Sequence, residues 1–325
     1  MKVLAADVGG TKTLLNVAEI VDGLPRTLHQ ERLPSSDYER FEDLLAAFFE
    51  QTGAEPHDIA AACLAVAGPV SDGRARLTNL PWSLESGTLT AALGGATVEL
   101  VNDFAAIAYA LPHLGPQELR TLQGAAQGGP RLIVGAGTGL GVCTMSADGE
   151  VMPGEGGHAG FAPADEQQAR LWTFVQSREG RCTREHLLSG HGIARIYAFL
   201  HQELDHDPDE ALTALGGGDP AAHITQRADT GSDKVARETL RLFARIYGSQ
   251  AGDLALGLLP RGGVYIAGGI APRILPFLTD GGLLDAFLDK PPMRAPLENT
   301  PLHVILDPEV GLKGAVYRAC QIGKA

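Results

Sequence analysis

The feature that most constrains this chain is a pattern of apolar strand, glycine turn and apolar strand that occurs twice. It first occupies Val3–Ala18, around the turn Gly9-Gly10-Thr11, and returns about 128 residues later in Leu132–Val142, around the turn Gly137-Thr138-Gly139. Two apolar runs joined by such a short glycine turn predict a β-hairpin. The repetition predicts two related domains, each with a glycine turn aimed at one phosphate chain, although two unrelated hairpins would give the same pattern.

Both turns suit the binding of phosphate. Glycines leave backbone N–H groups uncovered and Thr11 adds a hydroxyl, so the first turn is a candidate anion site. Asp7, at the end of the first strand, is placed to hold Mg²⁺ directly or through water. Neither turn matches a better-known motif, because Lys12 follows Thr11, unlike a P-loop, and Leu140 replaces the third glycine of the dinucleotide pattern. A plain turn with a solvated Asp7 is the alternative.

Strands and helices alternate along much of the chain, which predicts an α/β protein. Further strands are predicted at Ala60–Ala67, Val98–Val101, Gly263–Ile270 and Leu302–Leu306, and helices at Glu39–Gln51, Phe104–Leu111, Asp165–Arg178, Ser232–Leu259 and Pro308–Gln321. The segment Asp205–Pro220 is acidic and rich in glycine and proline, so it predicts an exposed loop.

Asp103 follows the strand Val98–Val101 and precedes a helix. In open α/β sheets ligands bind outside the carboxyl ends of strands, where an aspartate is placed to accept a proton from a substrate hydroxyl. The same position is the ordinary N-cap of a helix, and the local pattern alone favours this capping role.

The pentapeptide Gly154-Glu155-Gly156-Gly157-His158 holds a carboxylate and an imidazole in a glycine-rich loop. This pair suits a pocket for a hydroxyl-rich ligand such as a sugar, because Glu155 accepts hydrogen bonds and a neutral His158 both accepts and donates. A mobile surface loop is the alternative. A second Glu-x-x-His pair, Glu203 and His206, lies in a charged run before a proline, so paired helical iron ligands are not indicated.

Composition narrows the classes of function. With 26 basic and 39 acidic residues the chain has a net charge of −13, which argues against a nucleic-acid partner or an anionic membrane surface. Its cysteines, Cys63, Cys143, Cys182 and Cys320, form no C-x-x-C pair and are expected to be buried, reduced thiols. The first apolar run stops at Asp7 and none approaches roughly 18 residues, so we expect no signal peptide, no membrane span and a cytoplasmic location.

Several motifs occur in a fixed order. They are Asp7-Val8-Gly9-Gly10-Thr11, Asn102-Asp103, Gly135-Ala136-Gly137-Thr138-Gly139, Gly154-Glu155-Gly156-Gly157-His158, Arg184-Glu185 with Ser189-Gly190, and Gly268-Gly269-Ile270. Their order and spacing resemble the bacterial ATP-dependent glucokinases, members of the sugar kinase/actin/Hsp70 superfamily. The resemblance runs from about Val3 to about Arg318, nearly the whole chain.

The resemblance implies an α/β fold of two actin/hexokinase-like (ribonuclease H-like) domains with a central ligand cleft. The smaller N-terminal domain would comprise residues 1–112 with a C-terminal helix at 308–325, and the larger domain residues 113–307. The implied reaction is phosphoryl transfer from MgATP to the 6-hydroxyl of D-glucose, giving glucose 6-phosphate and ADP. The protein would be a homodimer, and closure of the domains would exclude water as a competing acceptor.

The resemblance also implies a role for each motif, with Asp103 as the general base. The implied sugar contacts are Asn102, Asp103, Glu155, His158 and Glu185, and the implied nucleotide contacts are Ala6, Asp7, Val8, Gly9, Gly10, Thr11, Gly137, Thr138, Gly268 and Gly269, with Asp7 holding Mg²⁺ through water. Two residues depart from the family pattern: Lys12, where asparagine is common, and His191, where proline is usual.

Two other functions fit the same motifs. One is a kinase for another hexose or an amino sugar, since the sequence does not rank glucose against mannose. The other is a non-catalytic sugar sensor, against which the presence of Asp103 argues, because a sensor needs no base. A sister family of sugar kinases and repressors carries a zinc motif of clustered cysteines that is missing here, and only two residues precede the first strand, so we do not expect a DNA-binding repressor.

Overall fold

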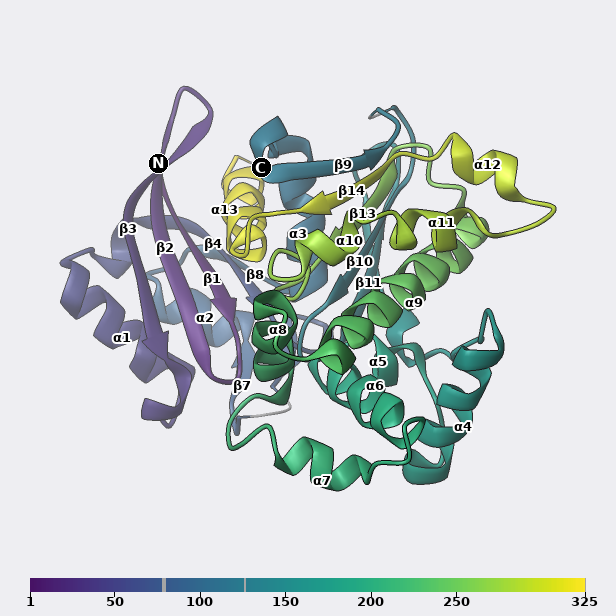
Figure 1. Cartoon of the computed structure of the whole chain (residues 1–325). Coiled ribbons are helices and arrows are strands. Elements are labelled where there is room, and N and C mark those ends of the chain that lie inside the picture. The colour runs from purple at the N-terminus through teal and green to yellow at the C-terminus, as the bar shows by residue number, and fades with distance from the viewer. Residues whose placement is uncertain (78–79, 126, 325) are drawn as a thin grey trace. The chain divides into compact units, whose positions relative to one another are not determined.

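The computed structural model describes residues 1–77, 80–125 and 127–324 (Figure 1). Contacts within the chain divide it into two compact units, which we call unit 1 (Met1–Leu114 with Glu309–Ala325) and unit 2 (Gly115–Pro308). Among the described residues, none of the helices combines the length and the apolar character that a bilayer crossing requires.

Unit 1 is built on a five-stranded mixed sheet. Its strands are β1 (Lys2–Val8), β2 (Lys12–Val21), β3 (Leu24–Pro34), β4 (Ile59–Val66) and β8 (Thr97–Asn102). In the order β3-β2-β1-β4-β8, the first three strands are antiparallel neighbours, whereas β4 and β8 run parallel to β1. The predicted opening hairpin is confirmed, but β1 extends to Val8, so Asp7 lies one residue before the end of the strand.

Helices pack on both faces of this sheet. The remaining elements of unit 1 are α1 (Phe41–Thr52), α2 (Ser86–Ala92), α3 (Asp103–Ala110) and α13 (Val310–Ile322), the 3₁₀ turns η1 (Ser35–Asp37), η2 (Pro56–Asp58) and η3 (Leu111–His113), and a small sheet of β5 (Val70–Ser71), β6 (Arg74–Arg76) and β7 (Ser83–Glu85). Side chains alternate along β1: Leu4, Ala6 and Val8 join the core that α1 and α2 cover. Val3 and Ala5, equally buried, point to the opposite face, and α13 contacts β1.

Unit 2 is built on a six-stranded mixed sheet. Its strands are β9 (Leu119–Gln123), β10 (Arg131–Ala136), β11 (Leu140–Met145), β12 (Val151–Gly154), β13 (Gly263–Ala267) and β14 (Leu302–Ile305), in the order β12-β11-β10-β13-β14-β9. Both sheets contain one series, an antiparallel hairpin followed by two parallel strands: β2-β1-β4-β8 in unit 1 and β11-β10-β13-β14 in unit 2. This shared topology supports the repeat that the two glycine hairpins predict.

The helices of unit 2 pack around α9 (Lys234–Leu258) (Figure 1). In a common apolar core, α9 contacts α6 (Gly190–Gln202), α8 (Pro220–Thr230) and α11 (Gly282–Leu288). The other elements are η4 (Pro116–Glu118), η5 (Gly156–His158), α4 (Glu166–Glu179), α5 (Arg184–Leu187), α7 (Pro208–Thr213), α10 (Leu275–Leu278) and α12 (Arg294–Glu298). One prediction is wrong: the expected loop Asp205–Pro220 contains α7. Its N-cap Asp207 and its first residue Pro208 are strong helix-start residues that also occur in loops.

Candidate active site

The first glycine turn follows the carboxyl end of β1 and is fixed by a buried serine. The Gly9 N–H donates to the Lys12 carbonyl oxygen at 3.1 Å, which closes the turn. Ser35 Oγ donates to the Gly9 carbonyl oxygen at 2.8 Å, and the Ser35 N–H donates to the Thr11 carbonyl oxygen at 3.0 Å. Ser35 therefore supports the turn, and the sequence does not indicate this role, because a loop serine carries no distinguishing signal.

Asp7 is placed by the alternation of β1 on the face that α13 contacts. A Cβ built at Gly311, in the first turn of α13, would lie 3.7 Å from Asp7 Oδ2. Burial raises the pKa of the Asp7 carboxyl; the Lys12 ammonium opposes this shift and the Glu309 carboxylate adds to it. A carboxylate in these surroundings is stabilised by a nearby cation.

The donor set around Asp7 fits a metal that arrives with a nucleotide. Mg²⁺ keeps several waters and is usually bound by one or two carboxylates together with substrate phosphates. Within the described part of the chain, no group of three or more His, Cys, Asp or Glu side chains could hold a metal ion. A single carboxylate beside the turn Gly9–Thr11 therefore suits Mg²⁺ shared with a phosphate chain.

Asn102 and Asp103 leave the same edge of the sheet as the first glycine turn. Val8 of β1 is in register with Val66 of β4, and Val66 is in register with Asn102 of β8, so the three strands end level. Two strand spacings of about 4.8 Å separate β1 from β8, which puts the two strand ends roughly 10 Å apart. Unit 1 thus presents a phosphate-binding turn and Asp103 at one sheet edge.

Asn102, rather than Asp103, is the N-cap of α3. Asn102 Oδ1 accepts the N–H groups of Phe104 at 2.9 Å and Ala105 at 3.3 Å, and its Nδ2 donates to the Gly68 carbonyl oxygen at 3.2 Å. The capping role that the sequence offers for Asp103 therefore belongs to its neighbour. Asp103 is the first residue of α3, partly exposed, and its Oδ1 accepts the Phe104 N–H at 3.0 Å.

Because Asn102 caps α3, we expect Asn102→Ala to lower the free energy of unfolding by about 1 kcal/mol, the usual cost of a lost N-cap. Urea unfolding of the wild type and the variant measures the difference. Asp103→Asn is the matched control and should lower the unfolding midpoint less than Asn102→Ala, since an asparagine keeps an acceptor for the Phe104 N–H. Equal midpoints for Asn102→Ala and the wild type would show that the cap assigned here is wrong.

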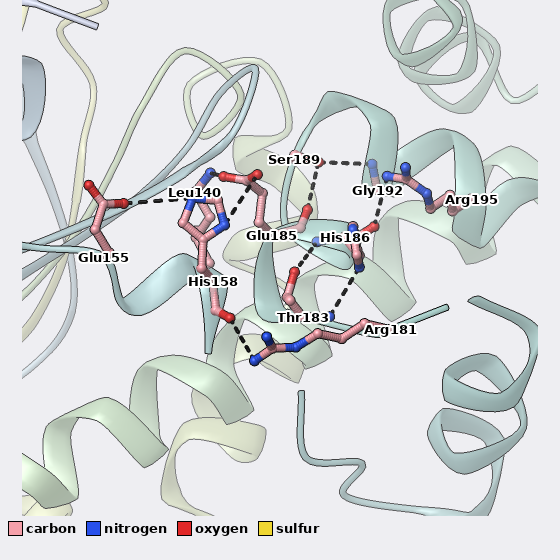
Figure 2. Close-up of polar contacts among 10 residues, drawn as sticks. All are labelled: Leu140, Glu155, His158, Arg181, Thr183, Glu185, His186, Ser189, Gly192 and Arg195. Atoms are coloured by element: carbon pink, nitrogen blue, oxygen red, sulfur yellow. Dashed lines mark hydrogen bonds and ion pairs between the residues drawn. The ribbon is translucent and has the colours of Figure 1, made fainter. Parts of the chain in front are cut away.

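Glu155, His158 and Glu185 meet in unit 2 and form what we call the carboxylate–histidine cluster (Figure 2). His158 Nε2 lies 3.7 Å from Glu155 Oε2, and its Nδ1 lies 3.9 Å from Glu185 Oε1. The side chains of Glu155, His158 and Glu185 are 72%, 62% and 32% exposed. Polar groups that face one another and remain open to solvent are suited to binding several hydroxyl groups of one ligand.

Glycines let the loop of this cluster press against β11. Gly157 is buried, and a Cβ there would overlap the carbonyl oxygen of Leu140. A Cβ at Gly156 would lie 3.1 Å from side-chain atoms of Val142. The Arg184 guanidinium donates to the Gly156 carbonyl oxygen at 3.2 Å. The backbone of the loop is therefore packed and bonded to its surroundings, which argues against a mobile loop.

Glu185 links the cluster to the second glycine turn. Its Oε2 accepts the Leu140 N–H at 2.9 Å, directly after the turn Gly137–Gly139 (Figure 2). The short helix α5, which carries Glu185, begins at the N-cap Thr183. The turn is also bonded to the start of α6, because the Gly190 N–H donates to the Gly137 carbonyl oxygen at 2.9 Å.

The same turn borders a cavity of about 910 Å³ within unit 2. This volume lies within the range of small-molecule sites, about 300–1,000 Å³. The cavity is lined by the turn, the start of α6, the helix α8 and the segment after β13; lining residues include Gly137, Thr138, His191, Asp229, Gly269 and Arg273. The sequence analysis does not predict α8, and it therefore does not identify the residues of this helix that line the cavity.

Gly268 and Gly269 form the turn after β13, on another side of the cavity. Gly135 of β10 is in register with Ala267 of β13, and the strands are parallel, so both glycine turns leave the same edge of the sheet. Gly268 has a φ of +87°, and a Cβ there would overlap the carbonyl oxygen of Ala136. This position therefore requires glycine.

The predicted site residues fall into two sets, one in each unit. Unit 1 holds Ala6, Asp7, Val8, Gly9, Gly10, Thr11, Asn102 and Asp103, and unit 2 holds Gly137, Thr138, Glu155, His158, Glu185, Gly268 and Gly269. The side chains of Ala6 and Val8 are packed in the core of unit 1, so only their backbone is left to contribute to a nucleotide site. All four cysteines are free and buried.

The glucokinase family model matches residues 4–322. A glucokinase of Trichormus variabilis is 38% identical over 98% of this chain and 99% of the relative. The crystal structure of a glucokinase from an Antarctic psychrotroph matches with a TM-score of 0.85 at 29% identity, covering 98% of this chain and 99% of that chain. A glucokinase of Balamuthia mandrillaris in complex with glucose matches with a TM-score of 0.80 at 25% identity, covering 98% and 93%. These likenesses confirm the predicted α/β fold of two actin/hexokinase-like domains.

Proposed function

The chain belongs to the glucokinase family and is an ATP-dependent sugar kinase, and from this premise we propose that it phosphorylates D-glucose at the 6-hydroxyl. The observation that carries the proposal is the turn Gly137–Gly139, which borders both the carboxylate–histidine cluster and the 910 Å³ cavity. A sugar bound at the cluster and a nucleotide bound in the cavity would share this turn. Such proximity suits direct phosphoryl transfer, which depends mainly on positioning and charge stabilisation.

We assign Asp103 as the general base. The O6 atom of glucose forms a bond to the γ-phosphorus while the bond from that phosphorus to the β–γ bridging oxygen breaks and its electron pair leaves with ADP. The proton of the 6-hydroxyl passes to the carboxylate of Asp103, late in a loose transition state. The assignment is supported by the position of Asp103 at the sheet edge that carries the first glycine turn, and by Asn102 taking over the capping of α3.

We assign the sugar contacts to Asn102, Glu155, His158 and Glu185. The two carboxylates accept hydrogen bonds from sugar hydroxyls, and His158 either accepts or donates. Asn102 Nδ2 has two N–H groups, and one donates to the Gly68 carbonyl oxygen, so the other is the group we propose for the sugar. Glu185 also accepts the Leu140 N–H, which fixes its orientation toward the cluster.

We assign the phosphate chain to the turns Gly9–Thr11 and Gly137–Thr138, and the adenosine to the cavity beside Gly268-Gly269. Asp7 would hold Mg²⁺ through water, and a bound Mg²⁺ neutralises charge on the phosphate oxygens. The expected homodimer rests on the family resemblance, and the expected cytoplasmic location rests on the unpaired cysteines and the lack of a long apolar run in the sequence. Both stay predictions.

A sugar panel tests the proposed function. At a fixed MgATP concentration we expect ADP release with glucose, with a higher kcat/KM for glucose than for mannose, fructose or glucosamine. The matched control is 6-deoxyglucose, which keeps the other hydroxyls but lacks the acceptor and should give only the sugar-free rate. A higher kcat/KM with another sugar would identify that sugar, rather than glucose, as the preferred substrate. Sugar binding without turnover of any sugar would indicate a sensor.

A further inference from the structure

One face of α9 carries two buried polar side chains, Tyr247 and Gln250. Both are fully buried in the core of unit 2, and residues three apart on a helix lie on one face. Burying a hydroxyl and an amide is costly unless both find hydrogen-bond partners. The partners of these two groups lie in the two halves of the candidate site in unit 2.

Tyr247 bonds to the ends of β10 and β13. Its hydroxyl accepts the Ala136 N–H at 3.0 Å and donates to the Val134 carbonyl oxygen at 2.9 Å, both in β10. The Ala267 carbonyl oxygen, at the end of β13, lies 3.4 Å away. The phenol therefore sits where the two parallel strands part, directly before the two glycine turns that border the cavity.

Ala136 connects Tyr247 to the second of these turns. Its carbonyl oxygen accepts the Ile270 N–H at 3.3 Å and is the atom that a Cβ at Gly268 would overlap. Because Tyr247 bonds to the N–H of Ala136 while the turn after β13 packs on its carbonyl oxygen, a displacement of Ala136 moves both turns together.

Gln250 acts on the other half of the site through Arg184. Gln250 Oε1 accepts from Arg184 Nε at 3.0 Å, and its Nε2 donates to the Ala162 carbonyl oxygen at 3.2 Å. Arg184 donates through Nη1 to the Gly156 carbonyl oxygen at 3.2 Å, and its N–H donates to the Ala159 carbonyl oxygen at 3.0 Å. Two carbonyls of the loop that carries His158 are thus bonded to one arginine, whose orientation Gln250 fixes.

We propose that this face of α9 positions both halves of the site in unit 2. Tyr247 fixes the position of the two glycine turns that border the cavity, and Gln250, through Arg184, fixes the position of the carboxylate–histidine cluster. Neither residue is a catalytic residue, since each acts through groups that we assign to substrate contact. The inference rests on the proposed function, which assigns the nucleotide to the turns and the sugar to the cluster. If the two residues only stabilised the fold, their loss would weaken the binding of both substrates alike. The positioning role predicts instead that each residue affects the binding of one substrate.

Tyr247→Phe tests the nucleotide half. We expect KM for ATP to rise about fivefold, the change that corresponds to one net hydrogen bond, while KM for glucose keeps its wild-type value. Tyr265→Phe is the matched control, because Tyr265 is a buried tyrosine of β13 whose hydroxyl donates to the Gly262 carbonyl oxygen at 3.2 Å, at the opposite end of that strand. Tyr265→Phe should leave both KM values unchanged.

Gln250→Met tests the sugar half, because methionine keeps the length of the side chain and removes the amide. We expect KM for glucose to rise about fivefold or more, with KM for ATP unchanged. Gln123→Met is the matched control: Gln123 Nε2, in the edge strand β9, donates to the carbonyl oxygens of Leu297 and Thr300, each at 2.8 Å. Both KM values should keep their wild-type size in Gln123→Met.

The outcomes separate the inference from the proposed function. A parallel rise of both KM values in Tyr247→Phe or Gln250→Met overturns the positioning role. If the wild type fails to turn over glucose, the proposed function is wrong, and calorimetric titration of ATP into Tyr247→Phe and Tyr265→Phe still decides the nucleotide half. Where Gln250→Met does not fold, Arg184→Lys perturbs the same link and must raise KM for glucose while KM for ATP keeps its wild-type value.

Discussion

Asp103→Asn is expected to fold and to bind glucose like the wild type while its kcat falls at least about 10²-fold, the usual scale of general-base catalysis. The asparagine keeps the shape of the side chain and an oxygen for the Phe104 N–H, which Asp103 Oδ1 accepts at 3.0 Å. It cannot take up the proton of the 6-hydroxyl. Steady-state ADP release at saturating glucose and MgATP measures kcat, and calorimetric titration measures glucose affinity.

The matched control for this prediction is Asp165→Asn. Asp165 is also an aspartate at a helix start, and its Oδ1 accepts the Gln168 N–H at 2.8 Å as the N-cap of α4. The substitution removes the same charge from a residue to which we assign no substrate contact, so kcat should stay at the wild-type value. Near-full turnover by Asp103→Asn would show that Asp103 is not the base.

The sequence predicts the two glycine hairpins well, because their signal is local. An apolar run on either side of a glycine turn leaves few alternatives to a tight reversal, and both hairpins form as antiparallel pairs. The predicted end of β1 at Asp7 is one residue early, since Val8 continues the ladder opposite Thr13. The pattern of apolar residues therefore identifies the element, whereas backbone pairing sets its last residue.

The roles of Asn102 and Asp103 show where local patterns fail. Both residue types are good N-caps, and they are adjacent, so the sequence cannot tell which of them caps α3. The answer depends on where the backbone leaves β8, and the register with Val66 sets that point at Asn102. The capping hypothesis for Asp103 was wrong for this reason.

The supports of the site are long-range and leave no sequence signal. Gln250 bonds to Arg184 across 66 positions and Tyr247 to Ala136 across 111, while Glu185 bonds to Leu140 across 45. In the sequence, Tyr247 and Gln250 are ordinary members of a helical pattern. Their polar atoms reach the groups that support the site only because α9 packs against the ends of β10 and β13 and against Arg184.

The other large effect is expected from Gly157→Ala, which should raise KM for glucose about tenfold. A Cβ at residue 157 would overlap the carbonyl oxygen of Leu140, and backbone atoms cannot move aside as a flexible side chain can. Overpacking of this kind costs about 1–3 kcal/mol, and about 1.4 kcal/mol corresponds to tenfold in affinity. Displacement of the loop would move Glu155 and His158, and displacement of Leu140 would disturb the N–H that Glu185 accepts.

Gly160→Ala is the matched control, because residue 160 lies three positions along the same loop and a Cβ there would meet nothing within 4 Å. Its KM for glucose and its melting temperature should equal those of the wild type. If Gly157→Ala also has the wild-type KM for glucose, displacement of the loop does not affect glucose binding. Glu155 and His158 would then belong to a surface loop, and the carboxylate–histidine cluster would have no part in recognition.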